Sequence, residues 1–166
     1  LIDTQGARSV MLEAAVLASD LAVSPITHEI LAARELRRGT LQLISDIEPY
    51  RHLGIRPPPL RLLINRVPPV SNNARVIQQA LRQIFESEPG IEVLGTTIPA
   101  IEAYPRAATQ GQPVHRIEPR RPAGRVAPAA LDTVRAVACE LFPPWRDQFA
   151  QVLSHPVRSP GDDERA

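Results

Sequence analysis

The feature that most constrains the fold is an alternation of short apolar runs with stretches whose apolar residues recur at helical spacing. The clearest run is LRLLINRV at Leu60–Val67, and its continuous apolar centre predicts a strand buried on both faces. Apolar runs at Leu21–Ile26 and Ile91–Ile98 predict two more strands. Leu1–Asp3 is typical of the end of a further strand, and Val114–Ile117 is predicted to be a small last one.

Helices are predicted between these strands, because apolar residues three and four positions apart share one helix face. Four of the predicted helices are Arg8–Ser19, Glu29–Glu48, a short piece at Ile101–Thr109 and a last piece at Trp145–Leu153. A fifth is predicted from the apolar stripe of Ala74, Ile77, Leu81, Ile84 and Phe85. A sixth begins at Pro128, and its predicted stripe is Leu131, Val134, Ala138 and Leu141. Gly39 lies inside the second of these and weakens the prediction of an unbroken helix there.

This order of elements predicts an α/β fold. Strands separated by helices, with few hairpin signals, indicate βαβ units and therefore a mostly parallel sheet with helices on both faces. We expect residues 1–153 to form this domain. The polar, proline-broken tail at 154–166 is expected to be disordered.

Composition narrows the classes of protein further. Hydrophobic residues make up 43% and charged residues 22% of the chain, as in globular proteins. All 19 basic residues are arginine, and the net charge of +1 argues against a strong uniform field for nucleic acid. No apolar run approaches the roughly 18 residues of a membrane span. The single cysteine, Cys139, excludes an internal disulfide and favours a cytoplasmic location.

Candidate site residues follow the predicted strands, because ligands of parallel sheets bind at the carboxyl ends of the strands. Asp3-Thr4-Gln5-Gly6 places a carboxylate and then a flexible turn after an apolar run. There Asp3 can hold the water shell of Mg²⁺, and Gly6 allows a backbone N–H to approach a phosphate. The alternative is that Asp3 caps the helix starting near Arg8.

Two further loops are candidates for a base pocket. Asn65 and Arg66 end the strongest strand, and an asparagine there can hydrogen-bond a base edge, or it can simply form the turn into the next loop. Pro99, with Tyr104-Pro105, makes a rigid loop that can wall such a pocket, or it is an ordinary strand-to-helix turn. The four histidines are scattered without a second ligand at metal spacing, so no metal site built from protein ligands is assigned.

Three segments, in this order, resemble the ParA/MinD-type partitioning ATPases, which are deviant Walker P-loop NTPases. LIDTQGARSVMLEAAVLASDLAVSPITHE resembles their Walker B, or switch II, segment. LLINRVPPVSNNARVIQQAL is similar to the strand, loop and helix that follow, and LGTTIPAIEAYPRAATQGQPVHRIEPR resembles their Ile-Pro block with its Gly-x-Pro-Val ending. The resemblance covers about residues 1–141 and implies a P-loop NTPase-like fold.

The resemblance implies an ATPase that binds ATP and Mg²⁺, forms a homodimer, binds non-specific DNA and partitions plasmids or chromosomes with a ParB-like partner protein. It implies that Asp3 holds Mg²⁺ through water and that Gly6 lies near the γ-phosphate. It also implies that Asn65 reads adenine, and that Arg66, Pro99 and Ile101 belong to the base pocket. Four arginines are candidates for contacts to the DNA backbone: Arg116, Arg120, Arg121 and Arg125.

The chain departs from the family at the phosphate. The family's phosphate-binding loop carries two lysines and precedes the switch II strand, whereas these 166 residues contain no lysine. The chain is therefore expected to be the C-terminal portion of a longer partitioning ATPase, inactive and poorly soluble by itself. A MinD-like ATPase with another cargo is an alternative, although the tail is not a basic amphipathic helix of the kind that binds membranes. A non-catalytic α/β interaction module is the third.

Overall fold

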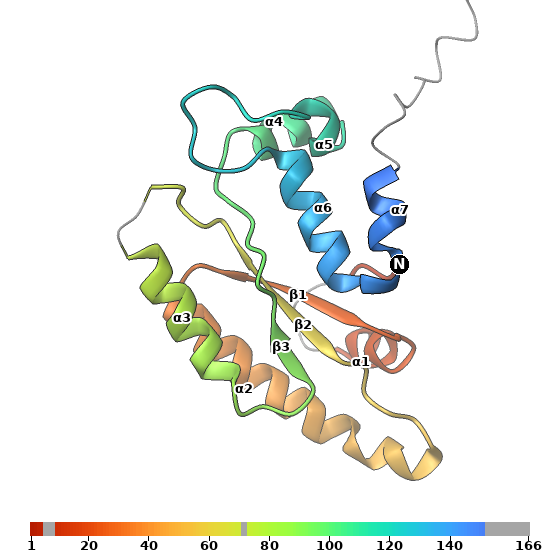
Figure 1. Ribbon diagram of the computed structural model, residues 1–166. Helices are drawn as coiled ribbons and strands as arrows, with labels where there is room; N and C mark the ends of the chain where they lie inside the picture. Colours follow the sequence, from red (N-terminus) through yellow and green to blue (C-terminus); the bar gives the residue numbers. More distant parts are fainter. Residues whose placement is uncertain (5–8, 71–72, 152–166) are drawn as a thin grey trace, which may run out of the picture.

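A three-stranded parallel sheet forms the centre of the protein in the computed structural model, which describes residues 1–4, 9–70 and 73–151. Its strands are β1 (Ala22–Thr27), β2 (Leu60–Asn65) and β3 (Ile91–Val93), in the order β1-β2-β3 (Figure 1). Leu60 lies opposite Ala22 on one side and Ile91 on the other. The prediction of an α/β fold with a parallel sheet is confirmed.

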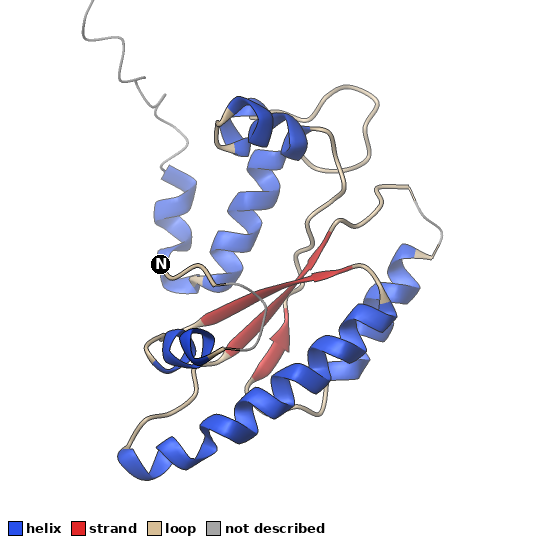
Figure 2. Ribbon diagram, turned by 180° about the vertical axis from the view of Figure 1, so that it is seen from behind, coloured by secondary structure: helices blue, strands red, loops and turns tan. Residues whose placement is uncertain are grey.

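Two helices pack side by side against one face of this sheet. Helix α2 (Ile30–Ile47) runs on into a 3-10 helix η1 (Glu48–Leu53) and connects β1 to β2, and α3 (Ala74–Phe85) connects β2 to β3 (Figures 1 and 2). Gly39 does not break α2, and open space surrounds the position where a side chain would begin. The main hydrophobic core lies between these helices and the sheet, and its buried members are Ile26, Ala33, Leu62, Ile64, Val67, Ala74, Leu81, Phe85 and Ile91.

The other face of the sheet is less covered. Along β2, Leu62 and Ile64 are fully buried, whereas the alternate residues Leu63 and Asn65 are half-buried. In β1, Val23 is 43% exposed while Ile26 is buried. The prediction that Leu60–Val67 is buried on both faces is therefore wrong for the second face, because α2 and α3 cover only the first.

A smaller group of helices lies toward that second face. It comprises α4 (Ala103–Gln110), α5 (Val114–Ile117), α6 (Ala130–Leu141), a 3-10 helix η2 (Pro143–Trp145) and α7 (Arg146–Gln151) (Figure 1). A second core cluster of Ile101, Ala103, Ala127 and Ala130 joins α4 to the start of α6, and α7 packs against α6. The predicted strand at Val114–Ile117 is wrong. After Pro113 the chain closes a single helical turn, in which the Glu118 N–H donates to the Val114 carbonyl at 3.0 Å.

The predicted stripe of the helix from Pro128 is also wrong. Its four members are at least partly accessible, and the buried residues of α6 are Ala130 and Thr133 instead. Helix α6 packs against α5 through small side chains, so its larger apolar residues do not form the buried face. Hydrophobic periodicity finds this helix but does not identify the side that is buried.

The N-terminal residues differ most from the prediction. Leu1–Thr4 is exposed and non-helical, with no strand pairing, so the strand predicted at Leu1–Asp3 is wrong. Helix α1 (Val10–Leu17) follows, and its N-terminus is capped by the Ser9 hydroxyl, which accepts the Leu12 N–H at 3.2 Å. Asp3 is therefore not the cap of this helix. The tail predicted at 154–166 lies outside the described residues.

Candidate functional site

The first component of the candidate site is the turn that ends β2. The side-chain oxygen of Asn65 accepts the backbone N–H of Arg66 at 2.8 Å. Arg66 has a φ of 58°, in the left-handed region that non-glycine residues seldom adopt. The local hydrogen bond from Asn65 stabilises that conformation. Asn65 thus has the turn-forming role that was the alternative to reading a base, and its side-chain amide group still has two N–H donors.

The second component is the segment that follows β3. Only Ile91–Val93 forms a regular strand, shorter than the predicted Ile91–Ile98, because the ladder is interrupted around Gly95. Pairing with β2 resumes beyond it, where the Ile98 N–H donates to the Ile64 carbonyl at 2.9 Å. Val67 then pairs with Pro99 in an isolated parallel bridge. The two loops predicted to form a base pocket are therefore adjacent.

A cleft of about 520 Å³ opens beside this bridge. Its walls come from the loop after β2, the first turns of α3, the segment after β3 and the loop before α6. The lining residues are Val67, Pro68, Pro69, Ala74, Arg75, Gln78, Thr97, Pro99, Val126, Ala127 and Pro128. Most of these residues are prolines or small aliphatic residues, but polar atoms form about half of the exposed lining, and Arg75, Gln78 and Thr97 supply polar side chains. Such walls fit a flat, partly polar ligand.

The predicted base-pocket residues take different places around this cleft. Pro99 lines it and is buried. Ile101 packs one layer behind, in the cluster that contains the cleft residue Ala127. Asn65 and Arg66 form the turn that leads into the lining loop and are not lining residues themselves.

Asp3 does not join this group. It lies in the exposed N-terminal segment, and both ribbon views place the start of the chain beside α7, away from the loop that follows β2 (Figures 1 and 2). The prediction that Asp3 and the base-pocket loops share one edge of the sheet is therefore wrong for this chain. Gly6 lies outside the described residues.

A buried ion pair supports the cleft from the side of α6. The Arg125 guanidinium donates to both carboxylate oxygens of Glu118, at 2.7 and 2.5 Å, and the Glu118 side chain is only 8% exposed. The hydrogen bonds from Arg125 hold the pKa of Glu118 below its ordinary value, against the opposing effect of burial. Nearby, burial raises the pKa of the Tyr104 hydroxyl, whose oxygen has no hydrogen-bond partner among the described residues.

A second carboxylate fastens α6 to the segment after β3. Glu140 accepts the backbone N–H of Thr96 at 2.9 Å and also that of Gly95. Burial by itself would raise the pKa of Glu140, but these backbone hydrogen bonds outweigh burial and lower it. From α3, Arg82 donates to the carbonyl oxygens of Leu94 and Gly95 at 3.2 and 3.1 Å. The segment that carries Thr97 and Pro99 is therefore held from two sides.

Sequence reasoning missed both of these carboxylates. Glu118 and Arg125 are seven residues apart in a turn-rich stretch that forms no continuous helix or strand, so no periodicity predicts their contact. Glu140 and its partners are more than 40 residues apart. Arg125 is one of the four candidate DNA contacts, but its guanidinium is bound to Glu118. Arg116, Arg120 and Arg121 are exposed.

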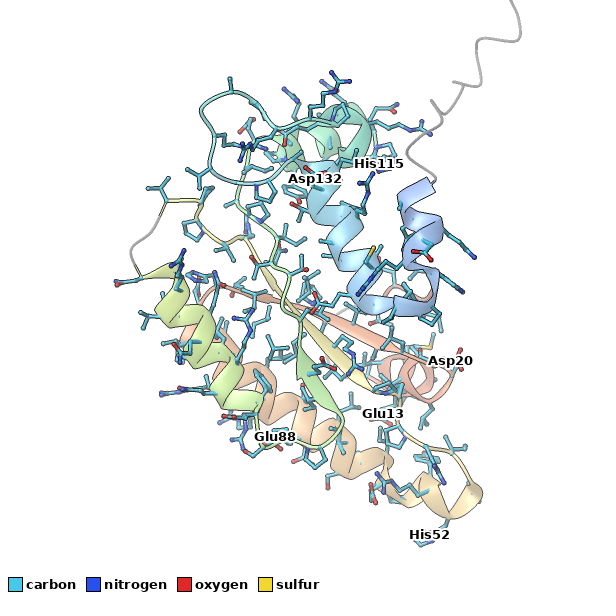
Figure 3. The ribbon with its side chains drawn as sticks, in the orientation of Figure 1. Glu13, Asp20, His52, Glu88, His115 and Asp132 are labelled. Carbon is cyan, nitrogen blue, oxygen red and sulfur yellow. The ribbon has the colours of Figure 1, made fainter. Side chains whose placement is uncertain are left out.

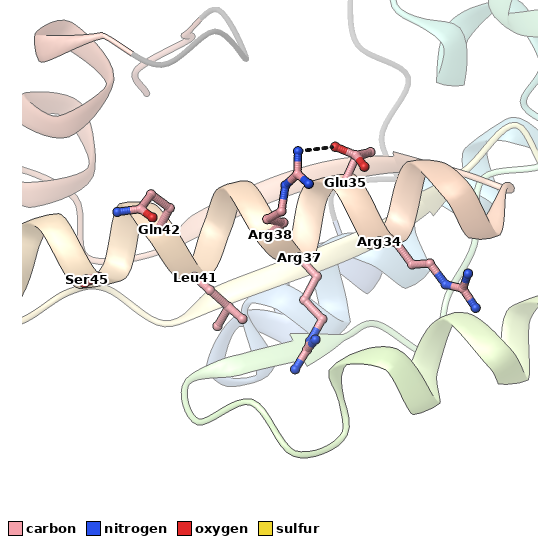
Figure 4. Close-up of a pocket in the computed structure, with 7 residues that line it drawn as sticks. All are labelled: Arg34, Glu35, Arg37, Arg38, Leu41, Gln42 and Ser45. Atoms are coloured by element: carbon pink, nitrogen blue, oxygen red, sulfur yellow. Dashed lines mark ion pairs between the residues drawn. The ribbon is translucent and has the colours of Figure 1, made fainter.

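A second depression lies on the outer surface of α2. It is shallow and is lined by Arg34, Glu35, Arg37, Arg38, Leu41, Gln42 and Ser45 (Figure 4). Arg38 pairs with Glu35 there. Arg37 pairs with Glu88, which lies in the turn after α3, and its Nε atom donates to a Glu88 carboxylate oxygen at 2.7 Å. Two of its three arginines are thus already paired with carboxylates.

Among the described residues, no group of three or more histidine, cysteine, aspartate or glutamate side chains is arranged to hold a metal ion. Figure 3 shows His52 and His115 at opposite ends of the molecule. Over the same part of the chain, each helix is too short or too polar to cross a bilayer.

Comparison with known proteins does not assign a family. The chain matches no model of a known protein family and no curated protein.

Proposed function

We propose that this chain is the base-binding part of a ParA-like ATPase domain of P-loop NTPase-like fold, and that the cleft beside the Val67–Pro99 bridge receives the adenine of ATP. The observation that carries the proposal is the position of this cleft. It lies where two neighbouring parallel strands deliver their following loops, which is where ligands of such sheets bind. Its mixed lining of proline, aliphatic and polar residues is compatible with a heteroaromatic ring, to which Gln78 and Thr97 would offer hydrogen bonds.

The phosphate and Mg²⁺ chemistry of this proposed ATPase requires groups that these residues do not bring together. The 166 residues contain no lysine, and Asp3 is exposed and away from the cleft. We propose that a phosphate-binding loop elsewhere in the intact protein completes the site and orders Asp3 and Gly6 around Mg²⁺. We propose that the intact ATPase forms a homodimer and binds non-specific DNA through exposed arginines such as Arg116, Arg120 and Arg121. We also propose that it acts with a ParB-like partner protein.

A non-catalytic interaction module is the second candidate. The separation of Asp3 from the cleft favours it, because a domain without nucleotide chemistry has no need to bring the two together. The two candidates differ in one measurable property, which is whether the cleft binds an adenine ring.

The test is the binding of adenosine and of ADP to the purified chain, measured by isothermal titration calorimetry. Wild type is compared with Val126→Trp, which places a bulky ring at the cleft wall, and with Val76→Trp on α3 as the matched control. Val126 and Val76 are 75% and 64% exposed, and only Val126 lines the cleft. We expect adenosine to bind wild type and Val76→Trp and to lose at least about tenfold in affinity for Val126→Trp.

Two results would contradict the proposal: no adenosine binding by wild type, or equal binding by both tryptophan variants. We further expect no ATP hydrolysis by this chain alone, since the family's phosphate-binding loop carries two lysines and these 166 residues contain none. Steady turnover of ATP by the purified chain would refute that expectation.

A further inference from the structure

One wall of the cleft belongs to a loop that hydrophobic packing holds only in part. Residues 119–129 connect α5 to α6 without regular secondary structure, and Gly124 has a φ of 75°. Three residues of this loop, Val126, Ala127 and Pro128, line the cleft. Ala127 is buried, but Val126 and Pro128 are exposed, so burial of apolar surface does little to position them.

Arg125 holds these same residues through their backbone. Its Nη2 atom donates to the carbonyl oxygen of Pro128 at 2.8 Å, and its Nε atom donates to that of Ala127 at 3.3 Å. The guanidinium also forms the two hydrogen bonds to Glu118 described above. The planar fork of arginine makes this combination possible, because a lysine ammonium cannot offer paired donors in one plane.

Glu118 in turn fixes the other end of the loop. One of its carboxylate oxygens accepts the Ala130 N–H at 3.0 Å, and its backbone carbonyl accepts the Leu131 N–H at 3.2 Å. Both donors lie in the first turn of α6, where helix N–H groups lack partners within the helix. The carboxylate therefore joins the start of α6, the end of α5 and, through Arg125, the cleft wall.

We infer that Arg125 and Glu118 are positioning residues that hold the Val126–Pro128 wall at the width needed for a planar base, and that breaking their contact loosens the cleft. This inference rests on the proposed function, since it assigns a role to the wall of the proposed base-binding cleft. The two side chains act through the backbone of the loop and do not line the cleft themselves.

The test compares four variants of the full chain. Arg125→Lys keeps the charge but removes the fork, and Arg125→Gln removes the charge. The double variant Glu118→Gln/Arg125→Gln avoids leaving a buried carboxylate without its partner, which could by itself prevent folding. Arg121→Gln, an exposed arginine of the same loop, is the control. Circular dichroism and the Tm identify the variants that remain folded.

Two properties are measured on the folded variants. Hydrogen exchange without ligand reports on residues 119–131, and calorimetry gives the affinity for adenosine. We expect exchange in this segment to accelerate by about tenfold or more in Arg125→Lys and in the double variant, with a loss of several-fold in adenosine affinity and little change in Arg121→Gln. A general loss of stability would instead accelerate exchange in β2 and α3 as well.

The outcomes separate the two proposals. Exchange that is unchanged in Arg125→Lys and in the double variant overturns the positioning role, and so does faster exchange with unaltered adenosine affinity. If wild type fails to bind adenosine, the proposed function is refuted and with it the role of the wall in base binding. The exchange data still decide in that case whether the ion pair holds the loop.

Discussion

The two hydrophobic clusters of this protein are stabilised in different ways. The cluster between the sheet and helices α2 and α3 is built from large side chains such as Leu62, Ile64 and Phe85, all nearly or fully buried. The cluster around α4 and α6 has one large member, Ile101, among buried alanines. Beside it stand the buried ion pair of Glu118 with Arg125 and the hydrogen bonds of Glu140.

This difference shows how a packed scaffold and a hydrogen-bonded cleft wall are combined in one fold. Burial of large apolar side chains is non-directional and gives the sheet layer its stability. Hydrogen bonds and ion pairs are directional, and they fix the loops at 94–99 and 119–129 at defined positions. The cleft lies where these two regions meet, so one side of it belongs to a packed core and the other to a polar network.

The largest expected effect is in the first cluster. Phe85→Ala removes a ring that is 2% exposed, and we expect the free energy of unfolding to fall by about 3–5 kcal/mol because of lost burial and the cavity left behind. Urea denaturation at pH 7 measures the change, with the exposed Val76→Ala on the same helix as control. A loss below about 1 kcal/mol would show that this cluster is loosely packed.

The second cluster should be sensitive to added volume rather than to removed volume. Ala130 is fully buried, and Ala130→Leu would force a branched side chain between α6 and its neighbours. We expect destabilisation of about 1–3 kcal/mol. Ala136→Leu, at an exposed position of the same helix, should be near neutral. Equal unfolding midpoints for the two leucine variants would contradict tight packing around small residues.

The same contrast explains which parts of the fold could be predicted. The sheet, α2 and α3 follow from sequence because their apolar residues are large and periodic, as the buried Leu81 and Phe85 of α3 illustrate. Helix α6 was found, but its buried face was not, since Ala130 and Thr133 have little hydrophobic signal. The four-residue α5 was predicted as a strand because four residues are too few to show a period.

The sequence predicted which two loops lie together at the candidate site, but not the ion pair that holds the neighbouring loop. The rule that ligands bind at the carboxyl ends of parallel strands correctly brought the loops of Asn65 and Pro99 together. It failed for Asp3, because the residues before it do not pair into the sheet. The Glu118–Arg125 pair was not predicted, since a contact between two positions of an irregular loop depends on the tertiary structure.

Acid should weaken the second cluster selectively. The pKa of Glu118 is lowered in the folded protein, so its ionised form stabilises the fold above the ordinary carboxyl pKa of 4.5. This contribution is lost as the pH falls below that value and through the lowered folded pKa. Urea denaturation between about pH 6 and pH 3 should therefore show a smaller loss of stability for Glu118→Gln than for wild type. The exposed Glu102→Gln is the control, and equal pH profiles for wild type and Glu118→Gln would contradict the prediction.

The smallest expected effect concerns the surface of α2, where two neighbouring arginines differ in their partners. Arg38 and Glu35 are 82% and 62% exposed and 3.5 Å apart, so we expect Arg38→Ala to change the free energy of unfolding by less than about 0.5 kcal/mol. Glu88, the partner of Arg37, is only 11% exposed, and Arg37→Ala would leave its carboxylate without that donor. We expect the second substitution to cost about 1–2 kcal/mol, measured by urea denaturation of both variants. If both variants lose the same free energy of unfolding, burial of the partner carboxylate does not make an ion pair of this fold more stabilising. That result would weaken the argument that Glu118 and Glu140 hold the cleft.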